Sequence, residues 1–307
     1  MSDIILPNLI IAGVAKAGTT SLFTYLALHP DICSSKIKEI GYFVPLRWGN
    51  SLALSLDEYS SYFSHCHEDV SPRYFMEASP GYFPGGKKIA EAMKQTLGDA
   101  KIILIFREPI SRLFSLFTFY KSRLKLSPEM SFREYVRLCE TMTADELRKT
   151  ENQVYGGLEA SYYGKLIADW FETFGDPGVK VLFFEQFRNN PHNVVAGIYD
   201  WLELDYEIPL PFEATVENKT MSFRNGFLQR MALKINRLAE GYWRSNPNVK
   251  RNLRRLYYVL NGRAVHDLID NETRMYLQEK FLPSNQRLAL ELINRGYTTF
   301  PEWLSIE

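Results

Sequence analysis

Nearly uninterrupted apolar runs recur along this chain and predict its buried strands. Three of them, Leu9–Val14, Lys101–Phe106 and Val179–Phe184, have the length and the apolar composition of strands that are covered on both faces. A fourth, shorter strand is expected at Arg73–Glu77. Strands of this kind are typical of a parallel sheet, because both sides of a parallel sheet are buried.

A segment with helix-like spacing of apolar residues follows each of the three long runs. These helices are expected at Thr19–Leu28, Ser111–Lys125 and Pro191–Leu202. Strand, loop and helix in series predict an α/β fold with three layers, in which helices flank a central parallel sheet. Ligands bind such sheets beyond the carboxyl ends of the strands. The informative loops are therefore those directly after Val14, Glu77 and Phe106.

The segment 225–260 differs from the rest of the chain because basic residues alternate with Leu, Tyr and Trp. We interpret it as two amphipathic basic helices, interrupted at Asn246-Pro247, that form a cap or insert near the C-terminal third. Its basic residues are Arg230, Lys234, Arg237, Arg244, Lys250, Arg251, Arg254 and Arg255. Two interpretations stay open: a solvated helical face, or a cap that meets an anionic acceptor or partner, including peripheral contact with a membrane.

The composition of the 307 residues argues against some classes of protein. Lysine plus arginine equals aspartate plus glutamate, at 36 each, and this neutrality argues against a dedicated nucleic-acid-binding protein. No apolar run reaches the about 18 residues that a membrane span requires. The N-terminal run leads straight into a glycine loop, as a buried strand does, and is not expected to be a signal peptide.

The cysteines and histidines predict neither a disulfide framework nor a metal site. Cys33, Cys66 and Cys139 are odd in number and widely spaced, which favours a reducing, cytoplasmic location. The run His65-Cys66-His67 is interpreted as a loop, because adjacent side chains do not easily converge on one tetrahedral ion.

The loop after the first strand has the glycine spacing of a phosphate-binding P-loop. Gly13 and Gly18 are placed as in that pattern, but Thr19 stands where the lysine belongs, and Lys16 lies inside the loop. Backbone N–H groups and the helix dipole favour an anion at such a turn. A tight turn built for geometry alone is the alternative, and it does not explain the internal lysine or the hydroxyl run from Thr19 to Ser21.

The loop after the second long strand carries a cation where nucleotide hydrolases hold their metal. Magnesium-dependent phosphoryl transfer uses an acidic residue at a strand end. Here Arg107 follows the apolar run directly. This disfavours an ATPase or kinase and favours a second contact with an anion.

These segments resemble the sulfotransferases that use 3′-phosphoadenosine 5′-phosphosulfate (PAPS). GVAKAGTTSL, Gly13–Leu22, resembles the loop that grips the 5′-phosphosulfate, and REPISRLFS, Arg107–Ser115, resembles the 3′-phosphate segment. The resemblance implies one P-loop-like domain over residues 1–307, with PAPS as donor, adenosine 3′,5′-bisphosphate as product and no metal requirement. The donor-binding residues it implies are Lys16, Ala17, Gly18, Thr19, Thr20, Ser21, Arg107, Ser115, Tyr163, Phe223, Gly262 and Arg263.

Further segments are similar to the heparan-sulfate branch of that family. KEIGYF (38–43), MEASPGYF (76–83), SYYGKLIADWF (161–171), ENKT (217–220) and NGRAV (261–265) carry this similarity. Ala78 and Asn261 depart from it, since the heparan members have lysines at both positions. The similarity implies a hydroxyl-bearing acceptor, with a carbohydrate first and a hydroxylated acyl chain or another small metabolite as the alternative.

The base that takes the acceptor proton has three candidates. The resemblance assigns it to Glu39, which its neighbour Lys38 can keep ionised, although Lys–Glu pairs are common on surfaces. Glu77, at a strand end expected to face the same cleft, and His266, near the late loop, are the alternatives. Lys16 is expected to stabilise the leaving phosphate. Two other functions stay open: a P-loop kinase or nucleotide hydrolase, and a non-catalytic nucleotide-binding protein.

Overall fold

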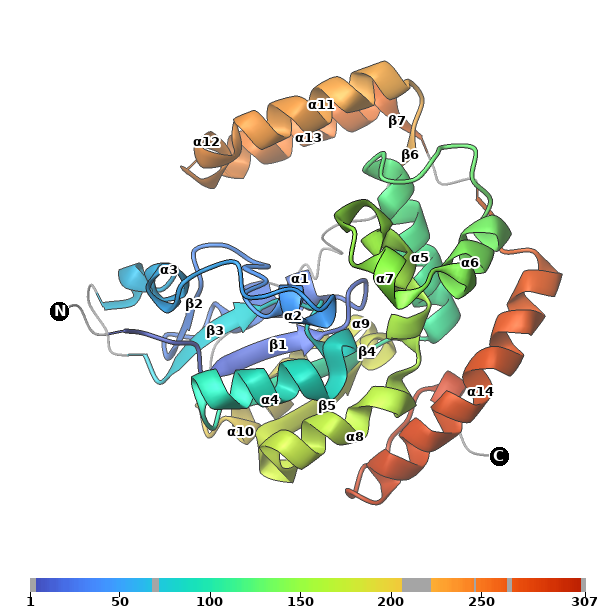
Figure 1. The fold of residues 1–307 in the computed structure, drawn as a ribbon. Helices are drawn as coiled ribbons and strands as arrows, with labels where there is room; N and C mark the ends of the chain where they lie inside the picture. The colour runs from blue at the N-terminus through green and yellow to red at the C-terminus, as the bar shows by residue number, and fades with distance from the viewer. Residues whose placement is uncertain (1–3, 68–71, 206–221, 246, 264–266, 305–307) are drawn as a thin grey trace.

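A five-stranded, all-parallel sheet forms the centre of the molecule (Figure 1). We describe residues 4–67, 72–205, 222–245, 247–263 and 267–304 of a computed structural model. The strand order is β2-β3-β1-β4-β5. The strands are β1 (Leu9–Gly13), β2 (Ile32–Ser34), β3 (Tyr74–Ala78), β4 (Lys101–Phe106) and β5 (Val179–Phe183).

Helices cover both faces of this sheet, as Figure 1 shows. On one face α8 packs between α4 and α14, and on the other α1 contacts α10. The helices of the body are α1 (Thr19–Leu26), α2 (Val44–Arg47), α3 (Leu56–Ser61), α4 (Gly86–Leu97), α5 (Pro109–Ser122), α6 (Phe132–Thr141), α7 (Ala144–Leu147), α8 (Tyr163–Phe174), α9 (Phe184–Asn189), α10 (Pro191–Trp201) and α14 (Asn271–Ile293). The predicted three-layer α/β fold is therefore confirmed.

The central strand β1 determines where the first loop lies. All five of its residues are buried, and it pairs with β3 on one side and β4 on the other. Its register with β4 shifts between Ile11 and Gly13, and such bulges often redirect the chain next to a functional loop. The carboxyl ends of β1 and β4 are thus adjacent, so the loops that follow them meet at one edge of the sheet.

The helix that leaves β4 begins with strong local signals. Pro109 occupies the first turn of α5, and the Glu108 carboxylate accepts hydrogen bonds from the Ile110 and Ser111 N–H groups. Both devices favour helix initiation. The inner side of α5 packs with α6 and α14 in a second apolar cluster that includes Leu113, Phe117 and Phe281. This packing fixes the direction of α5 beside the sheet edge.

A helical cap, defined here as residues 226–261, lies apart from the body at the top of Figure 1. It consists of α11 (Gly226–Leu238), α12 (Glu240–Ser245) and α13 (Pro247–Asn261). The short antiparallel pair of β6 (Ser222–Phe223) and β7 (Gly262–Arg263) closes its base. The predicted pair of basic helices is therefore present, with α12 as an additional turn between them. No helix in the described part of the chain has the length and apolarity needed to cross a bilayer.

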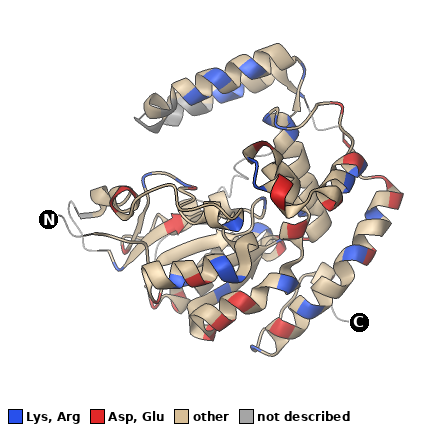
Figure 2. Cartoon of the chain, in the orientation of Figure 1, with Lys and Arg blue, Asp and Glu red and all other residues tan. Residues whose placement is uncertain are grey.

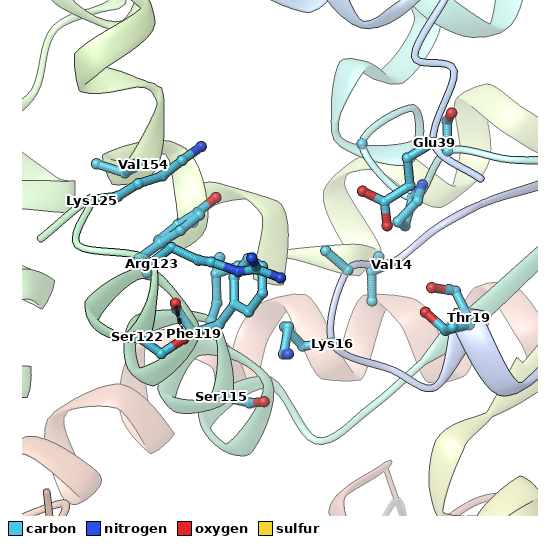
Figure 3. Close-up of a pocket in the computed structure, with 18 of the residues that line it drawn as sticks. Val14, Lys16, Thr19, Glu39, Ser115, Phe119, Ser122, Arg123, Lys125 and Val154 are labelled. Atoms are coloured by element: carbon cyan, nitrogen blue, oxygen red, sulfur yellow. Dashed lines mark hydrogen bonds between the residues drawn. The ribbon is translucent and has the colours of Figure 1, made fainter. Parts of the chain in front are cut away.

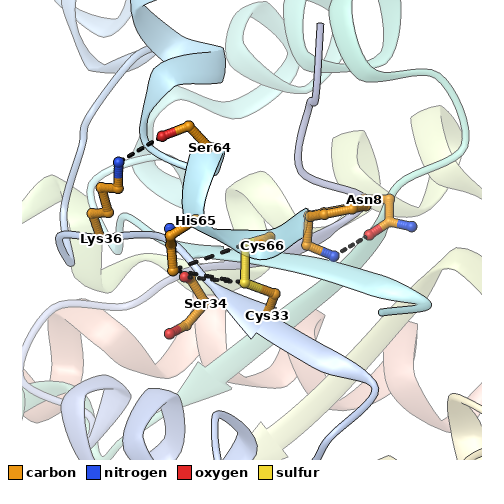
Figure 4. Close-up of a disulfide and its surroundings, with 8 residues drawn as sticks. Asn8, Cys33, Ser34, Lys36, Ser64, His65 and Cys66 are labelled. Carbon is orange, nitrogen blue, oxygen red and sulfur yellow. Dashed lines mark hydrogen bonds between the residues drawn. A yellow bond between two sulfur atoms is a disulfide. The ribbon is translucent and has the colours of Figure 1, made fainter. Parts of the chain in front are cut away.

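The cysteine prediction is wrong. Cys33 in the middle of β2 and Cys66 in the short 3₁₀ helix η1 (Ser64–His67) form a disulfide, with their Cα atoms 5.9 Å apart (Figure 4). The two cysteines are 33 residues apart in the sequence, and the fold brings them together at the sheet edge. The prediction of a reducing, cytoplasmic location rested on the absence of such a pair and loses that support.

The argument against convergence at His65-Cys66-His67 is also wrong in part. The sulfur atoms of Cys33 and Cys66 and a ring nitrogen of His65 lie within 4.8 Å of one another. The third member of this group, Cys33, comes from β2. The prediction considered only the three adjacent residues 65–67 and so missed it. Because the two sulfur atoms are bonded to each other, they are not thiolates free to ligate an ion.

Candidate active site

A cleft of about 1340 Å³ opens at the carboxyl edge of the sheet. Its walls come from the loops after β1, β2, β3 and β4, from α5, and from the inner side of the cap. This is the edge at which the sequence predicted ligand binding. Eight of the predicted site residues line this one cleft: Lys16, Gly18, Thr19, Thr20, Ser21, Glu39, Arg107 and Ser115.

The two glycines of the first loop have different physical roles. A Cβ at Gly13 would lie 2.5 Å from the Cβ of Phe83, so only glycine allows this close approach. Gly18 has φ of 85°, in the left-handed region, and it is the residue that precedes the first turn of α1. The glycine spacing therefore reflects one packing requirement and one backbone requirement.

The first turn of α1 faces the cleft without a capping side chain. Thr19, Thr20 and Ser21 all line the cleft. The N–H of Leu22 donates a hydrogen bond to the carbonyl oxygen of Gly18, as in a regular helical turn. The N–H groups at the start of a helix have no partner within it and carry partial positive charge. Ala17 is fully buried and lies behind this turn. The arrangement suits an anion.

Lys16 is held inside the cleft by the loop and by α5 (Figure 3). Its φ of 73° is uncommon for a residue other than glycine, and its Nζ lies 4.5 Å from the centre of the Phe119 ring. Burial, and after it the charges of Arg107 and Arg123, lower the pKa of Lys16 to about 8. The positive charges of Lys16, Arg107 and Arg123 repel one another, and an anion that binds among them removes this unfavourable interaction.

Arg107 lies against the same loop. Its Nη1 donates a 3.0 Å hydrogen bond to the carbonyl oxygen of Lys16, and its guanidinium lies 4.7 Å from the centre of the Phe184 ring. Burial lowers the pKa of Arg107. Ser115, two turns into α5, lines the cleft as well. The tips of β1 and β4 thus present two cations and a hydroxyl to one cavity.

Glu39 lies on the other side of the cavity from α5 (Figure 3). Its carboxylate accepts a 2.7 Å hydrogen bond from Lys38 Nζ, and about three fifths of its side chain is exposed, at 61%. Its φ is 66°, and its N–H donates to the carbonyl oxygen of Ala78 at the end of β3. Backbone in this region is strained and is over-represented at functional sites. Lys16 and Glu39 are two of only four such non-glycine residues in the described chain.

The prediction that Glu77 faces the cleft is wrong. Glu77 is completely buried, and its carboxylate accepts hydrogen bonds from the hydroxyls of Tyr59, Ser79 and Tyr82. Burial raises its pKa. Ser79 Oγ in turn accepts a 2.9 Å hydrogen bond from the N–H of Gly41. Glu77 therefore anchors the loop that carries Glu39, and it does so from the core.

Four other predicted donor residues do not line the cleft. Tyr163 is buried in the core, and its hydroxyl donates a 2.9 Å hydrogen bond to the carbonyl oxygen of Arg107. Phe223, Gly262 and Arg263 are brought together in the β6–β7 pair, whose Ser222 reaches the cleft. His266 lies outside the described residues, as does the segment 217–220.

The structure adds cleft residues that sequence reasoning missed. Arg123, directly after α5, extends the line from Ser115 through Phe119 at helical spacing, which could have identified it, and Lys125 lines the cleft two residues later. Arg47 stacks on Trp48 at 4.2 Å, donates to the carbonyl oxygen of Gly156 and has its pKa lowered to about 10 by burial. No local sequence signal marked that arginine.

The chain is similar to known sulfotransferases. The family model described as "Sulfotransferase domain" matches residues 6–226. A bifunctional heparan sulfate N-deacetylase/N-sulfotransferase of Drosophila melanogaster is 23% identical over 97% of this chain, and that of Mus musculus is 25% identical over 97%. The chain covers only 27% and 31% of those two relatives.

Two further matches have different extents. The membrane-associated sulfotransferase kil1 of Dictyostelium discoideum is 34% identical over 39% of this chain and 24% of its own length. The solved structure of a sulfotransferase from Alicyclobacillus acidocaldarius superposes with a TM-score of 0.66 at 21% identity, covering 98% of this chain and 99% of that one, which shows a shared fold. Because the family model covers well over half of the residues, the chain belongs to the sulfotransferase domain family.

Proposed function

We propose that this protein transfers a sulfuryl group from PAPS to an acceptor hydroxyl. The observation that supports this most directly is that Lys16 and Arg107 line one cleft together, with the Arg107 guanidinium donating a hydrogen bond to the backbone carbonyl oxygen of Lys16. A donor with phosphates at both the 5′ and 3′ positions needs two separate anion contacts. Membership of the family argues against the kinase and hydrolase alternatives.

The donor end is built from charge and backbone. Lys16, the N–H groups at the start of α1 and the hydroxyls of Thr19 and Thr20 hold the 5′ group and stabilise the charge that develops on the leaving phosphate oxygen. Arg107 and Ser115 hold the 3′-phosphate. Arg107 stands where an acidic metal ligand would stand in a nucleotide hydrolase, so we propose that Lys16 supplies the electrostatic role of the metal.

Glu39 is the proposed base. Its exposed carboxylate faces the cavity, whereas that of Glu77 is occupied by three hydroxyl groups in the core. In the reaction an acceptor oxygen forms a bond to sulfur while the bond from sulfur to the 5′-phosphate oxygen breaks. The acceptor proton passes to Glu39, and the leaving electron pair stays on the phosphate. Lys38 Nζ donates a 2.7 Å hydrogen bond to the Glu39 carboxylate and so orients it.

The acceptor end offers aromatic and apolar walls together with a buried cation. Trp48, Tyr120 and Leu116 line it, and Arg47 lies among them. We propose a carbohydrate hydroxyl, because two of the relatives are named for heparan sulfate and aromatic rings stack on sugars. The apolar side chains favour, as a second candidate, a hydroxylated acyl chain. Transfer of label from PAPS to desulfated oligosaccharides and to hydroxy fatty acids distinguishes the two.

The test of the donor assignment compares two nucleotides. The native protein should bind adenosine 3′,5′-bisphosphate more tightly than adenosine 5′-phosphate. Arg107→Ala should weaken binding of the bisphosphate about 10- to 100-fold, because a charged hydrogen bond is lost, and should hardly change binding of the monophosphate. Arg133→Ala, which breaks an exposed ion pair with Glu272, is the matched control. Equal affinity of the native protein for both nucleotides, measured by calorimetry, contradicts the proposal.

A further inference from the structure

The cap has one side that lines the cleft and another that points away from it. On α11, Gln229, Leu233 and Asn236 line the cleft. Phe227, Met231 and Leu238 each lie two positions in the sequence from one of these cleft-lining residues. Two residues of an α-helix correspond to a rotation of about 200° around the helix axis. These three apolar side chains therefore form the outward face of α11.

The outward face of α11 is apolar and exposed. Phe227 is 65% exposed and Leu238 is 73% exposed, and Met231 between them is exposed as well. Large exposed apolar side chains that gather on one face mark an interaction site more often than scattered ones do. Next to them on the helix run Arg230, Lys234 and Arg237, all of them exposed.

The second long helix of the cap repeats the pattern. On α13, Arg254, Tyr257 and Tyr258 line the cleft. Val249, Leu256 and Leu260 recur at helical spacing on another face and are exposed, and the neighbouring Val259 is 74% exposed. Both helices therefore combine a cleft-lining side with an exposed apolar side, and on α11 basic residues stand beside that apolar side.

Charge is distributed unevenly between the cap and the rest of the chain. Residues 226–261 contain eight Lys or Arg and one Glu, although the whole chain is neutral at 36 against 36. Figure 2 shows this concentration of Lys and Arg along the cap. The rest of the chain therefore has a net negative charge, whereas the cap is positively charged and complementary to an anionic surface.

We propose that the outward face of the cap, formed by Phe227, Met231 and Leu238 of α11 and by Leu256, Val259 and Leu260 of α13, binds the surface of an anionic lipid bilayer. Helices that lie in a membrane interface combine aromatic and aliphatic residues on one face with Lys and Arg beside them. The apolar side chains enter the region between headgroups and acyl chains, and the basic residues contact the headgroups.

Two other occupants fit the same observations less well. A second copy of the chain would bring two identical, strongly basic surfaces together, and juxtaposed like charges are costly. A nucleic acid or another soluble polyanion would satisfy the arginines but leave the aromatic and aliphatic face in water, since such interfaces are predominantly polar. Only an anionic bilayer meets both the apolar and the basic requirement.

The test is sedimentation of the full chain with lipid vesicles. We expect binding to vesicles that contain about one third phosphatidylglycerol in phosphatidylcholine, and little binding to phosphatidylcholine alone. Arg230→Gln with Lys234→Gln should lower the partition coefficient about 30-fold, since two charges are removed from the interface. Lys87→Gln with Lys88→Gln on α4, an exposed pair elsewhere on the molecule, is the matched control and should leave the binding unchanged.

A second pair of substitutions tests the apolar contribution. Phe227→Ser with Leu238→Ser should reduce vesicle binding at high salt by at least about tenfold, because the interaction that remains there is apolar. Far-UV circular dichroism verifies that the cap stays helical. None of these residues lines the cleft, so nucleotide affinity should stay unchanged in every variant, which separates this proposal from the sulfotransferase proposal.

Three outcomes overturn the proposal. One is equal binding to neutral and anionic vesicles, or binding to neither. Another is self-association of the chain without lipid that Phe227→Ser with Leu238→Ser abolishes, since the face is then an interface between copies. The third is binding to heparin as tight as to anionic vesicles and insensitive to the serine variants, which identifies a site for a soluble polyanion.

Discussion

The two walls of the cleft are built in opposite ways. The wall at the sheet edge is formed by the loops that follow β1 and β4, and the residues of these two strands are buried almost without exception. The cap wall grows out of a two-stranded base and exposes much of its apolar surface to solvent, including Leu238 and Val259. Catalytic groups must be held to within fractions of an ångström, and packing against a sheet provides this.

Burial is used differently on the two walls. At the sheet edge, charged side chains are buried. Lys16 and Arg107 are largely buried in the wall of the cleft, and Glu77 is completely buried in the core behind the loop that carries Glu39. On the cap, Arg230, Lys234 and Arg237 remain exposed, and so do large apolar residues such as Leu238 and Val259. We infer that the first wall is organised for a small anionic donor and the second for a large external surface.

The largest effect that would sharpen this comparison is expected at Glu39. Glu39→Gln removes the proton acceptor and keeps the shape, so turnover should fall about 10²- to 10⁴-fold. Affinity for adenosine 3′,5′-bisphosphate should stay near normal, because Lys16 and Arg107 are untouched. The measurement is initial-rate transfer from labelled PAPS together with nucleotide titration.

Glu91→Gln is the control for Glu39→Gln. Glu91 lies on α4, where it pairs with Lys87 at 3.8 Å, and it does not line the cleft. Its substitution should leave both the rate and the affinity unchanged. If Glu39→Gln has normal turnover, another residue is the base, and the strained loop that carries Glu39 has no role in proton transfer.

The next largest effect separates the stability of the two walls. Leu104 of β4 is completely buried, so Leu104→Ala should lower the free energy of unfolding by about 2–5 kcal/mol. Leu256 of α13 is 56% exposed, and alanine favours helix, so Leu256→Ala should change the free energy of unfolding by less than about 0.5 kcal/mol. Denaturant unfolding followed by fluorescence measures both. Equal losses would show that the cap is packed as firmly as the sheet.

The sequence predicted the sheet-edge wall well because its signals are local. The three long strands are apolar runs, and the glycine loop and Arg107 follow two of them directly. The strand β2 escaped prediction because three residues, Ile32–Ser34, are too few for a hydrophobic period. The two basic helices of the cap were also visible, since their periodicity extends over several turns.

Relations between distant segments could not be predicted. Glu77 resembled a strand-end carboxylate facing the cleft, and only the positions of Tyr59 and Tyr82 show that it is buried and occupied. The Cys33–Cys66 bond links segments whose proximity depends on the pairing of β2 with β3. The pairing of Phe223 with Gly262 at the base of the cap likewise joins segments that are far apart in the sequence.

The smallest effect concerns pH and tests whether burial at the sheet edge matters for binding. The pKa of Lys16 is lowered to about 8, so the free protein loses this charge as pH rises through 8. A bisphosphate needs the protonated lysine. Its affinity should therefore be nearly constant below pH 7 and should fall by up to about tenfold between pH 7 and 9. Calorimetric titration with adenosine 3′,5′-bisphosphate at each pH measures the change.

Lys16→Arg is the decisive comparison for that profile. A guanidinium remains protonated throughout this pH range, so the variant should bind the bisphosphate with an affinity that hardly changes between pH 7 and 9. If the affinity of the native protein for the bisphosphate does not change between pH 7 and 9, the cations of the sheet-edge wall are as solvated as those of the cap. A pH-dependent profile that persists in Lys16→Arg would assign the titration to another group. Only a step that is present in the native protein and absent from the variant ties the buried charge of Lys16 to donor binding.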